Sequence, residues 1–149
     1  MSQLGRKLGE ILIDKGLISD EQLQMALSDQ KITREFLGRV LIKNGWVSEI
    51  EVMKGLSEQF GIPFIEFELS MVDWAVVAQY SYALLSENNC IPISQDSTTV
   101  TVVISDPLNV WIVSEIESQS RGRNTQLMLA MQHEIKAALK EFTKRYAKQ

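Results

Sequence analysis

The sequence predicts an α+β fold, with a duplicated four-helix unit over residues 1–60 and a small α/β unit over residues 61–149. A 24-residue stretch occurs twice near the N-terminus, and its apolar residues recur at helical spacing. Residues 61–63 contain a glycine and a proline, which end the helical pattern. After them, short stretches rich in valine, isoleucine and threonine alternate with amphipathic ones, as strands and their covering helices do.

The two similar stretches are residues 7–30 and 36–59, and a five-residue linker, 31–35, joins them. Nine of the 24 aligned positions are identical, whereas chance would give about one or two identities at ordinary residue frequencies. Gly9 recurs as Gly38, for example, and Gln30 recurs as Gln59. The first part of the chain therefore contains an internal duplication.

Each copy predicts two helices joined by a tight turn, so that four short helices run from about Leu4 to residue 60. Gly16 fits the position just after a helix, where a left-handed backbone favours a residue without Cβ. Ser19 follows, with Gln22 three residues later, and this spacing is a capping box that begins the next helix. The second copy repeats these three features at Gly45, Ser48 and Glu51.

Two pairs of repeated residues are not explained by turns or caps. A glycine inside a helix costs roughly 1 kcal/mol relative to alanine, yet both copies carry one, at Gly9 and Gly38. Either a neighbouring helix crosses closely there, or a ligand approaches the backbone. Gln30 and Gln59 end the two copies with amides that both donate and accept hydrogen bonds. They are either exposed polar residues or ligand contacts.

Seven elements are predicted after the break, in the order β-α-β-β-α-β-α: a strand at 64–67, a helix at 71–85, strands at 90–94 and 99–104, a helix from Val110, a strand at 125–129 and a helix at 133–146. Asp73 lies near the start of the first helix. Asp106 and Pro107 predict a turn and helix start rather than a catalytic group. His133 is expected on the surface, and Trp111 is a candidate contact residue.

Composition and charge exclude several classes of protein. The chain has 15 basic and 19 acidic residues, and residues 55–120 contain no lysine or arginine, which argues against nucleic-acid binding. That acidic span is either a solvated surface or one that favours a basic partner. Cys90 is the single cysteine, so no internal disulfide forms, and one cysteine with one histidine is too little for a usual zinc site. No apolar run approaches the roughly 18 residues that span a bilayer.

The repeat resembles the tandem cyclic di-GMP binding motif in the N-terminal domains of type II secretion and type IV pilus assembly ATPases. That motif has Arg-Leu-Gly, two apolar residues, a later glycine with two apolar residues, two leucines and a final glutamine. Each family motif spans 24 residues, with five between the two, and both lengths match here. Residues 60–146 also resemble the α/β half of the same domain, so the resemblance covers nearly the whole chain.

The resemblance implies a ligand site on both copies. Apolar contacts to the two guanines would come from Leu8, Leu12, Leu23, Leu27, Leu37, Leu41, Val52 and Leu56. Gly9 and Gly38 would let the ligand reach the backbone, and Gln30 and Gln59 would bond its polar edges. Lys7 and Phe36 stand where the family has arginine. Lysine is a mobile point charge rather than a planar fork, and phenylalanine stacks on a base but pairs with no phosphate.

We therefore expect a regulatory or docking domain that is not an enzyme. The sequence has no phosphate-binding loop of the G-x-x-x-x-G-K-[ST] type, no nucleophile elbow and no metal-ligand cluster. No cofactor is expected, and cyclic di-GMP is the implied ligand. Family partners would be an ATPase motor, in cis or in trans, and the cytoplasmic region of an inner-membrane assembly protein. The alternative is a docking module without nucleotide binding. The expected location is the cytoplasm, with attachment to the inner membrane through the assembly protein. This expectation holds whether the chain is a fragment or stands alone.

Overall fold

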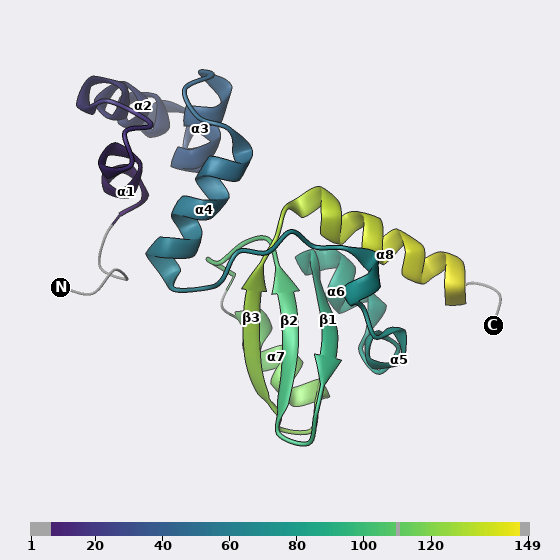
Figure 1. Ribbon diagram of the computed structural model, residues 1–149. Coiled ribbons are helices and arrows are strands. Elements are labelled where there is room, and N and C mark those ends of the chain that lie inside the picture. The colour runs from purple at the N-terminus through teal and green to yellow at the C-terminus, as the bar shows by residue number, and fades with distance from the viewer. Residues whose placement is uncertain (1–6, 110, 147–149) are drawn as a thin grey trace. The chain divides into compact units, whose positions relative to one another are not determined.

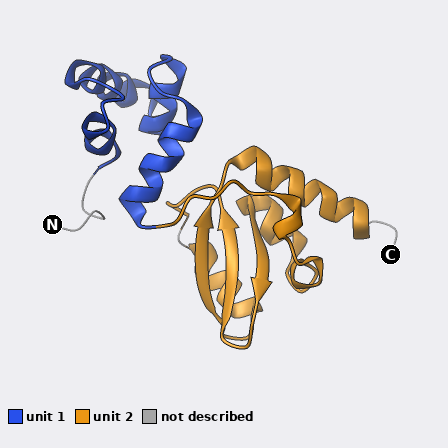
Figure 2. Ribbon diagram, in the orientation of Figure 1, with its two compact units in different colours: residues 1–61 blue, residues 62–149 orange. Residues whose placement is uncertain are grey.

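The computed structural model describes residues 7–109 and 111–146. The chain divides into two compact units, residues 1–61 and 62–149 (Figure 2). No helix among the described residues is long and apolar enough to cross a membrane. The predicted α+β fold class is confirmed, because helices alone form the first unit and a small sheet with helices forms the second (Figure 1).

The first unit has four helices, as the repeat predicts: α1 (Leu8–Asp14), α2 (Asp20–Thr33), α3 (Leu37–Lys43) and α4 (Glu49–Phe60). Both capping boxes form, since the Ser19 hydroxyl accepts from the Gln22 N–H and the Ser48 hydroxyl from the Glu51 N–H, each at 3.1 Å. The glycines after α1 and α3 have left-handed backbones, with φ of +75° and +76°. The expected helical position of Leu4 lies outside the described residues.

Helices of the two copies pack on each other: α1 of the first copy packs on α4 of the second, and α2 of the first packs on α3 of the second. The duplication relates these two contacts, since it maps α1 onto α3 and α2 onto α4. Leu12 and Leu41 occupy the same position in the two copies and are both fully buried. The copies therefore share one core, in addition to the contacts within each helical hairpin.

The second unit is a three-stranded sheet in the order β1-β2-β3, covered by short helices. Strands β1 (Cys90–Gln95) and β2 (Thr99–Ile104) form the predicted antiparallel hairpin, and β3 (Asn124–Leu129) is parallel to β2. Helix α7 (Trp111–Gln119) connects these parallel strands, and α8 (Gln132–Tyr146) packs on β1 and β2. The helix predicted from Val110 is described from Trp111, because Val110 lies outside the described residues.

The predicted helix at 71–85 is wrong. The segment is instead a 3-10 turn (Leu69–Met71) and two short helices, α5 (Trp74–Val77) and α6 (Tyr82–Asn88). Asp73 caps the first by accepting from the Ala75 N–H, and Ser81 caps the second by accepting from the Leu84 N–H. Between them, the buried Tyr80 donates its hydroxyl to Gln95 on β1 at 2.9 Å. This bond ties the segment between the two helices to the sheet.

The strand predicted at 64–67 is also wrong, since only one bridge forms, between Phe64 and Leu129. The Ile65 N–H donates to the Leu129 carbonyl at 2.8 Å. The next N–H on the same side of that strand, at Met131, donates to the Glu134 carboxylate at 3.3 Å instead. The ladder therefore has no continuation beyond this bridge.

We expect Ser19→Ala and Ser48→Ala each to lower the free energy of unfolding by about 1 kcal/mol, because each removes the side-chain acceptor of a helix start. Chemical denaturation followed by circular dichroism measures the change. Ser28→Ala is the matched control, because Ser28 is exposed within α2. A Ser28→Ala loss as large as the other two would contradict the assignment of the caps.

Candidate functional site

The repeated glycines lie in equivalent surroundings. A Cβ built on Gly9 of α1 would lie 2.6 Å from Cδ1 of Leu23 in α2. A Cβ built on Gly38 of α3 would lie 2.6 Å from Cγ1 of Val52 in α4. Leu23 and Val52 are themselves equivalent, 29 residues apart in the two copies. Of the two explanations left open by the sequence, close helix packing is therefore present at both glycines.

The packing of Leu23 and Val52 against the two glycines limits the access of a ligand to the glycine backbones. Gly9 and Gly38 are buried, and the space next to each is filled by Leu23 or Val52. Leu23 is half-buried and meets Gly9 with the end of a flexible side chain, whereas Val52 is buried and branched at Cβ. A ligand would contact the Gly9 backbone only after Leu23 changes its rotamer. In the second copy the equivalent change at Val52, next to Gly38, has a higher barrier.

The structure separates the predicted apolar residues into two groups. The buried residues, which form the core of the unit, are Leu8, Leu12, Leu41, Val52 and Leu56. The half-buried ones, which present apolar surface to solvent, are Leu23, Leu27 and Leu37. Only this second group is accessible to a ligand without rearrangement of the core.

The side chains of the two repeated glutamines make no capping hydrogen bond in the described part of the chain. Gln30 lies near the end of α2 and Gln59 near the end of α4, and both are half-buried. Within residues 7–109 and 111–146, neither side-chain amide has a hydrogen-bond partner. The amides are therefore free to bond a ligand.

Lys7 and Phe36 hold the same place in the two copies, at the N-cap of α1 and of α3. Lys7 is exposed, and Phe36 is 41% exposed. The Phe36 ring folds over its own helix start, because a Cβ on Gly38 would lie 2.7 Å from Phe36 Cε1. The first copy thus presents a cation at this position, and the second presents an aromatic ring.

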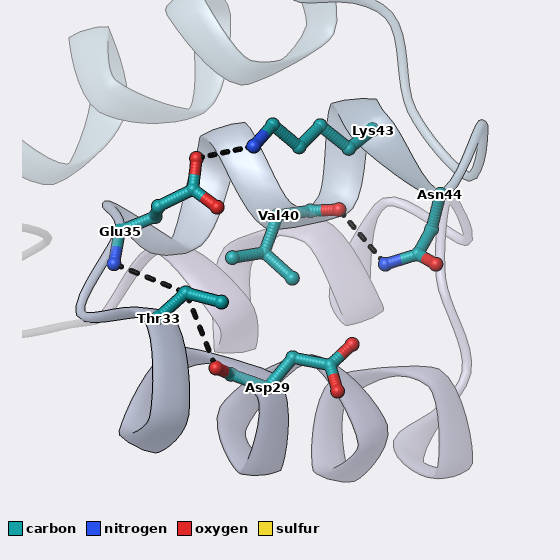
Figure 3. A network of polar contacts seen from close by, with 6 residues as sticks. All are labelled: Asp29, Thr33, Glu35, Val40, Lys43 and Asn44. Atoms are coloured by element: carbon teal, nitrogen blue, oxygen red, sulfur yellow. Dashed lines mark hydrogen bonds and ion pairs between the residues drawn. The ribbon is translucent and has the colours of Figure 1, made fainter.

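Polar contacts hold the linker between α2 and α3, which directly precedes Phe36 (Figure 3). The Thr33 hydroxyl donates to the Asp29 carbonyl at 3.2 Å and accepts from the Glu35 N–H at 3.3 Å. The Glu35 carboxylate pairs with Lys43 of α3 at 2.6 Å. The linker is therefore tied at one end to α2 and at the other to α3.

The sequence analysis missed Gly55, a buried residue of α4. A Cβ there would lie 2.7 Å from Leu8 Cδ1, so the glycine allows α1 to approach α4. Its equivalent in the first copy is Ala26, which is fully buried. Two small residues at one repeat position were the signal that could have identified this crossing.

Among the described residues, no three histidine, cysteine or acidic side chains gather where they could hold a metal ion. Burial raises the pKa of the Cys90 thiol to about 12, so it stays protonated and is not a nucleophile at neutral pH. Asp106 accepts from the Leu108 N–H at 2.9 Å, which confirms its predicted place in a turn. His133 is exposed on α8, and Trp111 is 53% exposed.

We expect Gly38→Ala to destabilise the chain more than Gly9→Ala, by about 1 kcal/mol or more. The added methyl meets the stiff Val52 side chain and the Phe36 ring at Gly38, but only the mobile end of Leu23 at Gly9. Thermal unfolding of both variants measures the difference. Adding Val52→Ala to Gly38→Ala should recover part of the loss, and strictly additive losses would contradict the close contact.

Comparison with known proteins identifies the family. The MshEN domain model matches residues 60–147, most of which belong to the second unit. The type IV pilus assembly ATPase PilB of Myxococcus xanthus is 25% identical over 136 residues, which cover 91% of this chain and 24% of that protein. PilB of Thermus thermophilus is 36% identical over 113 residues, which cover 74% of this chain and 12% of that protein. The chain thus spans about a quarter or less of these relatives.

Solved structures share the fold of the whole chain. A structure of MshE with cdg (cyclic di-GMP) has a TM-score of 0.82 at 24% identity, and the match covers 92% of this chain and 99% of that one. A structure of the N-terminal domain of XpsE has a TM-score of 0.62 at 18% identity and covers 94% of this chain and 95% of that one. These matches confirm the resemblance to N-terminal domains of secretion and pilus assembly ATPases, and the chain belongs to the MshEN domain family.

Proposed function

We propose that this chain is a non-catalytic regulatory domain of a type II secretion or type IV pilus assembly ATPase, and that its tandem motifs bind cyclic di-GMP. One observation carries the proposal. Gln30 and Gln59 are identical in the two copies, half-buried, and without a hydrogen-bond partner among the described residues. No hydrogen bond among the described residues engages these amides, whereas a ligand would. The solved MshE structure with cdg has the same fold.

The chemistry of the ligand matches a duplicated site. Cyclic di-GMP has two identical guanosine halves, and the first unit has two equivalent motif copies. Leu23, Leu27 and Leu37 offer half-buried apolar surface on which a guanine can lie. The free amides of Gln30 and Gln59 can both donate to and accept from a guanine edge. Each copy would thus contact one half of the ligand.

The first unit offers fewer contacts to the phosphates of the ligand than to its bases. Lys7 supplies one exposed cation at the start of α1, but the equivalent Phe36 supplies none. A charge-assisted hydrogen bond contributes about 1.5–3 kcal/mol, or about ten- to a hundredfold in affinity. We therefore expect weaker binding than by a chain with arginine at both positions.

A second candidate function is docking without nucleotide, and the Phe36 ring favours it. The ring lies over Gly38, and Phe36 occupies the position at which the family motif has arginine. Ile32, in the last turn of α2 and four residues before Phe36, is 83% exposed, so two large apolar side chains are exposed in this part of the sequence. The partner would be the cytoplasmic region of an inner-membrane assembly protein or an ATPase motor, in cis or in trans. Such docking would place the chain in the cytoplasm, at the inner membrane.

Gln30→Ala and Gln59→Ala are expected to weaken cyclic di-GMP binding about three- to tenfold each, because each removes a hydrogen bond to a base. Isothermal calorimetry on the 149-residue chain measures the affinity. Gln24→Ala, at an exposed position of α2, is the matched control. Equal affinities for all three variants would contradict the assigned contacts. No heat with the unchanged chain at high micromolar ligand would reject nucleotide binding and favour docking.

Phe36→Arg should tighten cyclic di-GMP binding about ten- to a hundredfold, because it supplies a planar phosphate donor in the second copy. Ile32→Arg adds the same charge outside the motif and controls for general electrostatic attraction. Calorimetry at two salt concentrations separates the two effects, since general attraction is screened more strongly. A gain of the same size in both variants would contradict a specific role for position 36.

A further inference from the structure

The second unit has a cavity of its own, lined by residues outside the repeated motifs. A half-open cavity of about 460 Å³ is lined by Gln79, Gln119, Arg121 and Arg123. Gln79 follows α5, Gln119 ends α7, and the two arginines lie in the connection from α7 to β3. None of these residues belongs to the repeated motifs.

Arg121 and Arg123 form no salt bridge among the described residues, although Arg123 interacts electrostatically with the nearby Asp96. Lys15, Lys43 and Arg145 each pair with a glutamate at 3.5 Å or less. Within the described part of the chain, no carboxylate lies at ion-pair distance from Arg121 or Arg123. They are also the first basic residues after Lys54 in the sequence. The cavity therefore carries local positive charge in an otherwise acidic part of the chain.

Arg123 is held in place by the protein itself. Its Nε donates to the Asp96 carbonyl and its Nη1 to the Ser120 carbonyl, both at 2.6 Å. These two bonds leave N–H groups of the guanidinium unused, because arginine has five donors. A guanidinium that is already fixed loses little conformational freedom when a ligand binds it.

The other polar side chains that line the cavity have more unused hydrogen-bond donors than unused acceptors. The Gln79 Oε1 accepts from Gln95, and the Gln119 Oε1 accepts from the Ser81 N–H at 3.0 Å. The side-chain acceptors of both glutamines are thus engaged, while the Gln119 amide nitrogen and the exposed Arg121 still have donors to offer. A lining of this kind complements a group that only accepts hydrogen bonds and carries negative charge.

We propose that this cavity binds an oxyanion, the phosphate or carboxylate group of a small ligand. Arg123 and Gln119 form the fixed part of the site, and Arg121 closes on the anion from the exposed side. The cavity is larger than a single oxyanion, so it also holds part of the body that carries the group. This site is separate from the proposed nucleotide site, and its test does not depend on that proposal.

The test is an NMR titration of the 149-residue chain with sodium phosphate in one arm and sodium glutarate in the other, at constant ionic strength. We expect saturable shifts of the Gln119 amide and of the Arg121 and Arg123 Nε–H signals. The arm with the tighter binding identifies the group as phosphate or carboxylate. Shifts that do not saturate in either arm, or that are as large at other basic residues, overturn the proposal.

Arg121→Asn should weaken the binding about ten- to a hundredfold, because it removes a charge-assisted contact. Asparagine tolerates the left-handed backbone of this position, where φ is +65°. Arg34→Asn is the matched control, because Arg34 is also exposed and has φ of +61°. Arg121→Lys should restore part of the affinity. Equal affinities of the two asparagine variants would show general charge attraction and overturn the site.

Discussion

The contact between a glycine of one helix and an apolar side chain of the next governs the first unit. Helices α1 and α3 have seven residues each, and helices of that length are not stable alone in water. They depend on packing, which Gly9 and Gly38 make close by admitting Leu23 and Val52. Because these helices begin at Lys7 and Phe36, the contact also positions the residues that differ most from the family motif.

The fold could be predicted where neighbouring residues determine the local structure. It could not be predicted where a contact with a residue distant in the sequence determines it. Both capping boxes and both left-handed glycines follow from residues within one turn of each other, and all are present. The single helix predicted at 71–85 failed because periodicity does not show where a cap will act. The bond from Tyr80 to Gln95, fifteen residues away, ties the segment between α5 and α6 to the sheet. Such a bond has no signature in the local sequence.

The candidate site was predictable as a set of equivalent positions but not as a surface. Helical spacing places the repeated leucines on the same face, yet it does not show which of them the other copy covers. Leu8 is buried and its equivalent Leu37 is half-buried, because they pack against different helices, α4 and α2. The cavity with Arg121 and Arg123 in the second unit was not predictable at all, since it joins segments about forty residues apart.

The pattern of identity between the copies suggests how a ligand would be shared between them. Packing, turns and caps account for the repeated leucines, glycines and Ser19 with Ser48, whereas the amides of Gln30 and Gln59 have no hydrogen-bond partner among the described residues. The helix starts, exposed in both copies, have instead diverged to a cation and an aromatic ring. On the proposed function, the two halves of a symmetric ligand would meet the same amide twice but a different residue at the helix start. The first copy would then hold a phosphate and the second mainly a base, so that the two halves of the ligand are bound unequally.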